Sequence, residues 1–155
     1  MVIYNLLVRD RNRVLTAWSD IDVQLKRRHD LIPKLVEAVK QYADYESSTL
    51  AHITELRSQS EAVSDIVKKG ELETELAGEV KRLIALAEDY PELKANESYL
   101  DLQRNLTEVE QHLQYARRYY NGAVRNLNIR VQSFPDLLIA KLFGYRPAQY
   151  FQFET

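Results

Sequence analysis

The chain contains no cysteine and only four glycines and four prolines among its 155 residues. The absence of cysteine excludes disulfide bonds, thiolate nucleophiles and cysteine-based metal sites. The scarcity of helix-breaking residues favours a small number of long helices. The longest apolar runs, such as residues 137–140, fall far short of the roughly 20 residues that span a bilayer, so the sequence as given predicts no transmembrane helix.

The chain also lacks an excess of charge of either sign. Lysine and arginine total 21 against 23 aspartates and glutamates, which gives a net charge of -2. Such a balance provides no long-range attraction to nucleic acid or to anionic lipid, so we expect no nucleic-acid partner, and any role of the basic residues must be local. Hydrophobic residues make up 45% of the chain, which is typical of globular proteins. The length fits one core, and we predict a single domain over residues 1–155.

Apolar residues recur at three- and four-residue steps through most of the sequence, which is the pattern of amphipathic helices. The most regular stretch runs from residue 99 to residue 127. A first helix is expected to end in the basic run 26–29, with Asp30 opening a second helix and Pro33 in its first turn. The alternative is one kinked helix through Pro33. Because long helices joined by short turns bury their apolar faces by running antiparallel, we predict an all-α antiparallel bundle of three to five long helices.

Further boundaries follow from single residues. Gly70 is expected to end the second helix. Asp89, with Glu92 three residues later, predicts the N-cap of a new helix. A short helix is expected through Leu142, followed by an aromatic tail over residues 145–155. We expect this tail to dock on its own bundle, with anchoring on a partner or a membrane as the alternative.

The sequence carries none of the motifs that would indicate catalysis. A di-metal bundle requires glutamate three residues before histidine, and His29, His52 and His112 all lack it. There is no His-Glu-x-x-His motif, no phosphate-binding glycine loop and no nucleophile elbow. We therefore expect no metal, no cofactor and no enzymatic activity.

Two groups of residues are the candidates for partner contact. An exposed polar turn is expected between the first two helices, and the tail offers aromatic side chains of the kind enriched at interfaces. The candidate contact residues are Arg27, Arg28, Asp30 and Lys34 in the turn and Tyr145, Tyr150 and Phe151 in the tail.

Some polar residues on the apolar faces have structural interpretations. Arg11 interrupts the first apolar face and is expected either to pair with Glu46 or Asp22 inside the bundle or to lie at its edge. Four tyrosines lie on apolar faces and are expected in the core. They are Tyr4, Tyr42, Tyr99 and Tyr120.

Three stretches of the chain resemble the signature of the LemA family. The first is Tyr-Asn-Leu-Leu-Val at residues 4–8 with Arg-Asn-Arg-Val at 11–14 and the run from Ala17 to Pro33. The second is Tyr-Pro-Glu-Leu-Lys-Ala-Asn-Glu at 90–97, and the third is Ala-Arg-Arg-Tyr-Tyr-Asn at 116–121. The resemblance extends over nearly the whole chain.

The resemblance implies an antiparallel helical bundle preceded by one N-terminal transmembrane helix that ends just before residue 4. We therefore expect the natural protein to carry a membrane anchor before Met1 and to lie in a bacterial membrane or envelope. The implied function is a membrane-tethered interaction or scaffolding module with unidentified protein partners, and self-association is left open. The alternative is an enzyme, or an accessory subunit in envelope proteolysis, that uses a pocket between helices.

Overall fold

The computed structural model describes residues 2–43 and 47–152, and this part of the chain consists of helices, short connections and an extended C-terminal segment, with no β-strand. The prediction of an all-α fold is thus confirmed. None of the helices in these residues is both long and apolar enough to cross a bilayer. The helices are α1 (Val2–Tyr42), α2 (Ser47–Ala62), α3 (Ile66–Ala87), α4 (Pro91–Lys94), α5 (Glu97–Gln132) and α6 (Asp136–Leu142).

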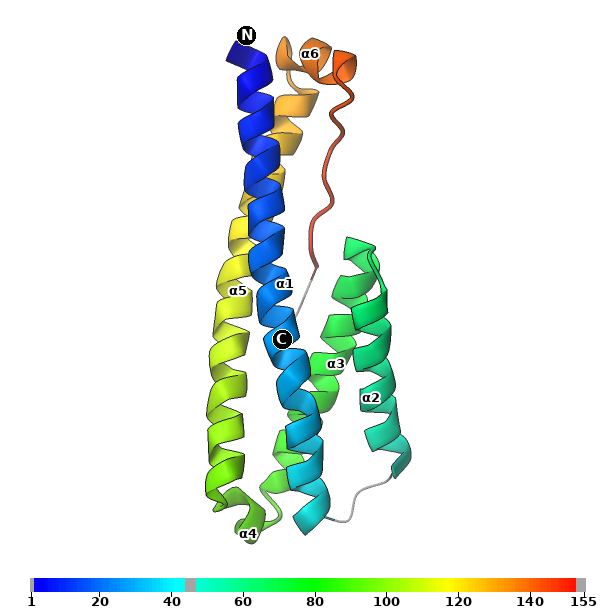
Figure 1. Cartoon of the computed structure of the whole chain (residues 1–155), viewed down its shortest axis with the longest axis vertical. Coiled ribbons are helices and arrows are strands. Elements are labelled where there is room, and N and C mark those ends of the chain that lie inside the picture. The colour runs from blue at the N-terminus through cyan, green and yellow to red at the C-terminus, as the bar shows by residue number, and fades with distance from the viewer. Residues whose placement is uncertain (1, 44–46, 153–155) are drawn as a thin grey trace.

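The molecule is a rod built on two long antiparallel helices, α1 and α5 (Figure 1). The α2–α3 hairpin packs beside one half of this pair. The other half, where α1 begins, is covered by α6 and by the extended C-terminal tail, which runs back along the rod (Figure 1). The tail thus takes the place that a third helix would fill, and the expectation that it docks on its own bundle is confirmed.

Two apolar clusters follow one another along the rod, and α1 contributes to both. The first joins α1 and α5 to the tail, through residues such as Ile21, Tyr120 and Phe151. The second joins the later part of α1 to the hairpin, through residues such as Leu35 and Leu76. Buried side chains in both clusters recur at three- and four-residue steps on each helix, which is why these segments fold as helices.

The first helix does not end near residue 29. It runs unbroken through Pro33 to Tyr42, so the expectation of a turn there was wrong and the single-helix alternative was right. Ile32 and Leu35 are buried on either side of the exposed Pro33 and continue the apolar face of the preceding turns. A proline inside a helix costs about 3 kcal/mol, and burial of this continued face offsets that cost.

The expected boundary at Gly70 was also wrong, because this residue lies inside α3. Gly70 is buried where the tail crosses α3, and a Cβ at this position would lie 2.3 Å from the carbonyl oxygen of Gln152. The glycine permits a close approach of two segments. The N-cap expected at Asp89 was likewise wrong, because the helix that begins there is α4, whose N-cap is Tyr90. The next long helix, α5, is capped by Asn96, which accepts a hydrogen bond from the Tyr99 amide at 3.1 Å.

Asparagine side chains of α5 hold the tail. Asn121 donates to the carbonyl of Phe151 at 3.1 Å and accepts from the amide of Phe151 at 2.9 Å. Asn128 makes the same pair of bonds to Ala148, at 3.0 and 2.7 Å. The backbone of an extended segment needs such partners when it is buried, and the two asparagines supply them.

The four tyrosines expected in the core divide into two pairs. Tyr99 and Tyr120 are buried, as expected. Tyr42 is half-buried, and Tyr4 is exposed at the end of the rod, where it packs on Phe143 with ring centroids 4.7 Å apart. Tyr120 packs in the first apolar cluster and Tyr99, in the first turn of α5, packs in the second. Tyr4 and Tyr42 lie near the two ends of α1.

Arg11 lies at the edge of the bundle, which was the second of its two expected positions. Its guanidinium lies 4.9 Å from the ring centroid of Tyr145. Asp22 pairs instead with Lys26, at 3.1 Å. Glu46, the other expected partner, and residues 153–155 of the expected tail lie outside the described residues.

Candidate functional site

A cluster of charged and polar side chains is buried between the helices near the middle of the rod. Arg28 and His29 come from α1, Ser60 from α2 and Glu73 from α3. The carboxylate of Glu73 accepts hydrogen bonds from Arg28, from the Ser60 hydroxyl at 2.5 Å, and from His29 Nε2 at 2.5 Å. Three helices are therefore joined at one carboxylate.

The electrostatics of the cluster keep Glu73 ionised. Burial by itself would raise the pKa of this carboxyl, but the hydrogen bond from His29 and the charges of Arg28 and His29, helped by Ser60, lower the pKa to about 2. Because the carboxylate has no proton to share, the Nε2 atom of His29 carries the proton in their hydrogen bond. Glu73 is thus a fixed negative charge at neutral pH and not a group that exchanges protons.

The cluster also extends toward the surface on two sides. Arg28 donates to Glu110 of α5 at 2.9 Å, and Arg57 donates to the backbone carbonyl of His29 at 2.7 Å. On the other side, His29 Nδ1 lies 3.5 Å from Glu61. Through these contacts the cluster links α1, α2, α3 and α5.

A small pocket of about 250 Å³ opens beside His29, and its wall includes Asp22, Glu61 and Lys69. Within the described residues, no group of three or more histidine, aspartate or glutamate side chains is placed to hold a metal ion. A buried, hydrogen-bonded ionic group of this kind specifies how helices align. The arrangement of the cluster therefore fits a structural role in setting the register of the bundle.

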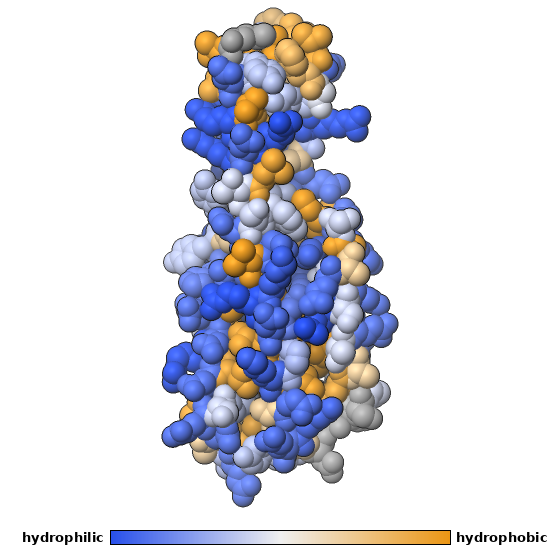
Figure 2. All heavy atoms as spheres, viewed as in Figure 1, coloured by the Kyte–Doolittle hydropathy of each residue, from blue (hydrophilic) through white to orange (hydrophobic). Residues whose placement is uncertain are grey.

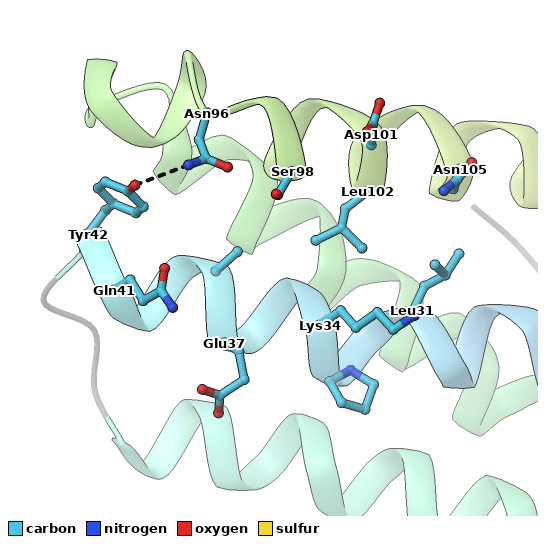
Figure 3. Close-up of a pocket in the computed structure, with 12 residues that line it drawn as sticks. Leu31, Lys34, Glu37, Gln41, Tyr42, Asn96, Ser98, Asp101, Leu102 and Asn105 are labelled. Carbon is cyan, nitrogen blue, oxygen red and sulfur yellow. Dashed lines mark hydrogen bonds between the residues drawn. The ribbon is translucent and has the colours of Figure 1, made fainter.

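A larger hollow lies between the end of α1 and the start of α5, and we call it the α1–α5 groove (Figure 3). Its volume is about 660 Å³. Leu102 and Ser98 point from α5 toward α1, and Asn96 donates to the Tyr42 hydroxyl at 3.1 Å across one end (Figure 3). The groove is lined by Leu31, Pro33, Lys34, Glu37, Ala38, Gln41, Tyr42, Asn96, Ser98, Asp101, Leu102 and Asn105.

The structure separates the candidate contact residues that the sequence had grouped together. The expected polar turn is the interior of α1, where Arg27, Asp30 and Lys34 are exposed but Arg28 is 0% exposed. Arg28 was therefore wrongly expected at the surface, because its charge is paired inside the bundle. Of the four, only Lys34 lines the α1–α5 groove.

The aromatic tail residues are similarly divided. Tyr150 is partly exposed, whereas Tyr145 and Phe151 are buried. The ring of Phe151 lies 5.3 Å from Trp18. Phe151 and Tyr145 were thus wrong as free contact residues, because the bundle itself occupies their surfaces.

Glu73, Ser60 and Glu110 were missed from the sequence. A signal for the cluster was nevertheless present on α1, because Arg28 continues the spacing of Ile21, Leu25, Ile32 and Leu35 once the helix is taken as continuous. An arginine at a core position of a helix requires a buried acid opposite it. The sequence alone does not say which acid that is.

Comparison with known proteins gives one family and several relatives. The sequence profile described as the LemA family matches residues 17–155. Magnetosome protein MamQ 2 of Paramagnetospirillum magneticum is 24% identical over 176 residues, an alignment that covers 96% of this chain and 64% of the relative. Protein LemA of Metamycoplasma hominis is 29% identical over 131 residues, covering 84% of this chain and 60% of the relative. The chain thus spans less than two thirds of the length of either relative.

Proposed function

Because the chain belongs to the LemA family, we propose that it is an interaction module of a membrane-associated protein and that a partner protein binds in the α1–α5 groove. The observation that carries this proposal is an open groove between two helices whose lining combines apolar and charged side chains. An amphipathic helix is the partner element that suits such a groove, because it would lie along α1 and α5 and add to the bundle.

The composition of the groove supports a specific and reversible contact. Leu31, Ala38 and Leu102 supply apolar surface, which drives association. The rim carries charges of both signs, with Lys34 on α1 and Asp101 on α5. Mixed charges at the edge of an interface select the orientation of a partner more than they add affinity.

The names of the relatives refer to the magnetosome and to the LemA family, and they specify neither a reaction nor a binding partner. The buried cluster also favours a module without catalysis, because the Glu73 carboxylate is ionised and its hydrogen-bonding capacity is used within the bundle.

The proposal is tested by site-specific photocrosslinking in the full-length protein in its native cells. A photoreactive residue is placed at Asn105, which lines the groove, and in a second variant at Thr107, which is exposed on another face of α5. We expect a discrete protein adduct from position 105 and none from position 107. Equal crosslinking from both positions, or none from either, would refute the groove as the binding site.

A second candidate function has one observation in its favour, the pocket beside His29. A histidine, two carboxylates and two lysines line this pocket, which is the kind of site that an enzyme or an enzyme subunit would use. The test is a metabolite screen by thermal shift on the purified chain and on its Lys69→Met variant. A ligand that stabilises the chain but not the variant would favour this candidate over the interaction module.

A further inference from the structure

The end of the rod where α1 begins and α6 lies has an unusually apolar surface. Hydrophobic residues cover this end in the space-filling view, and hydrophilic residues form a band next to them (Figure 2). The most exposed apolar side chains here are Phe134, Val2 and Leu142, at 80, 75 and 74% exposure. Single exposed apolar residues are ordinary, but a contiguous group marks a surface that contacts something. We call this group, together with Leu138, the apolar tip.

The local structure presents these side chains outward on a firm base. Leu138 and Leu142 lie one turn apart on α6 and so share a face. Beneath them, Phe143 packs on Tyr4 of α1, which fixes α6 to the end of the long helix. The tip residues Leu138 and Leu142 thus stand on a folded helix that contacts the start of α1, so its backbone need not fold on binding.

The charge around the tip differs in sign from that of the whole chain. Residues 2–13 and 125–146 contain seven lysines or arginines and two aspartates, whereas the chain as a whole has a net charge of -2. Both aspartates, Asp10 and Asp136, accept hydrogen bonds from Arg130, at 2.7 and 2.9 Å. The basic side chains that remain exposed near the tip include Arg11, Arg13, Arg125, Lys141 and Arg146.

We propose that the apolar tip docks on the surface of an anionic lipid bilayer. Phe134, Leu138 and Leu142 would enter the interface between headgroups and acyl chains, and the surrounding basic side chains would lie at the level of the lipid phosphates. Apolar residues combined with basic ones are the composition of interfacial membrane contacts. The rod then stands on the membrane with the α2–α3 hairpin directed away from it.

The charge at the tip also argues against a second copy of the chain as its occupant. Two tips brought together would place the excess of basic residues of one copy, seven against two aspartates, next to the same excess on the other. Like charges face to face oppose association. An anionic surface is attracted by the same residues.

The inference does not depend on the α1–α5 groove. The groove residues begin at Leu31 of α1, and at 1.5 Å per residue this is about 40 Å along the helix from Val2. Loss of protein crosslinking from Asn105 would therefore leave lipid binding unaffected, and the two proposals fail separately.

Vesicle flotation with the 155-residue chain tests the proposal. The probes are vesicles of phosphatidylglycerol mixed with phosphatidylcholine, and vesicles of phosphatidylcholine alone. A double variant, Leu138→Gln with Leu142→Gln, removes apolar surface from the tip. Leu15→Gln is the matched control, because Leu15 on α1 is 58% exposed and Leu138 is 57% exposed. A second variant, Lys141→Glu with Arg146→Glu, reverses charge without touching the apolar residues.

We expect the wild-type chain and Leu15→Gln to float with the anionic vesicles, at least ten-fold more than with the neutral ones. Both tip variants should lose at least ten-fold in vesicle binding, and the wild-type binding should fall as salt is raised. Binding that is absent, that is equal on neutral vesicles, or that survives both tip variants would overturn the proposal. Size-exclusion chromatography covers the remaining case, since a wild-type dimer that dissociates in the Leu138→Gln, Leu142→Gln variant would identify the tip as a self-association surface instead.

Discussion

Replacement of Gly70 by alanine should detach the C-terminal tail from the bundle. The new Cβ would lie 2.3 Å from the carbonyl oxygen of Gln152, far inside normal van der Waals contact. The obstacle is backbone, which cannot rotate away as a side chain can. The tail must therefore move by about 1 Å or more at Gln152, next to the point where Asn121 holds the backbone of Phe151.

The size of the effect follows from what the tail buries. Phe151 is 0% exposed and packs against Trp18. Loss of a buried phenylalanine side chain lowers the free energy of unfolding by about 3–5 kcal/mol. Alanine is favoured over glycine inside a helix by about 1 kcal/mol, which offsets part of this cost. We expect a net loss of about 2–4 kcal/mol in the free energy of unfolding, or roughly 5–15 °C in Tm.

Urea unfolding measured by tryptophan fluorescence reports on this change directly, because Trp18 is the single tryptophan of the chain and packs against Phe151. Its emission should shift to longer wavelength in the folded variant as its neighbour leaves. Gly78→Ala is the matched control, since Gly78 lies on the same helix and an added Cβ there meets nothing within 4 Å. This control should be more stable than wild type by about 1 kcal/mol.

The reasoning would be refuted if Gly70→Ala and Gly78→Ala unfolded at the same urea concentration with wild-type emission in the folded state. That result would mean that the tail adjusts to the alanine without leaving Phe151, and that its docking does not depend on the close approach at α3.

Three further changes test the cluster, the tail and the groove. The folded-state pKa of Glu73 is about 2 against a usual 4.5. The ionised carboxylate therefore contributes roughly 3 kcal/mol to the free energy of unfolding, and this contribution is complete above about pH 5 and is lost as the pH falls from 4.5 toward 2. The urea midpoint of the wild-type chain should therefore fall as the pH is lowered through this range. The same fall in Glu73→Gln would contradict this assignment. Asn121→Ala removes two hydrogen bonds to the tail and should cost about 2 kcal/mol, measured by urea unfolding, whereas Asn126→Ala on the exposed face of α5 should cost almost nothing. Lys34→Glu should lower crosslinking from Asn105 several-fold with an unchanged Tm, and an equal fall in Lys81→Glu, which lies outside the groove, would show that the effect is not local.

The long helices could be predicted from the sequence, whereas the points where they meet could not. The steps of three and four residues between Tyr99 and Leu127 predicted most of α5, which spans Glu97–Gln132. The helix boundaries predicted near Pro33 and at Gly70 were wrong. Local preference favours a boundary at each residue, and tertiary packing overrides that preference. Burial on both sides of Pro33 keeps α1 intact, and the approach of Gln152 explains the glycine inside α3.

The candidate site was harder to predict for a different reason. Arg28 meets a carboxylate 45 residues away, and a single sequence does not reveal which of its 23 acidic residues is the partner. Lys34 was chosen as part of an expected polar turn, and although α1 replaces that turn, the side chain of Lys34 is exposed as expected. The α1–α5 groove could not be predicted from the sequence. It forms between two helices that are distant in sequence, and it depends on how closely α1 and α5 approach each other.

The unbroken course of α1 through both apolar clusters makes this helix a mechanical link between the two ends of the rod. Val2 and Lys34 belong to one helix and lie about 48 Å apart along its axis at 1.5 Å per residue. A turn would have absorbed motion between them. A continuous helix couples a rotation or axial shift at its first turn to the wall of the groove more directly than two helices joined by a turn would.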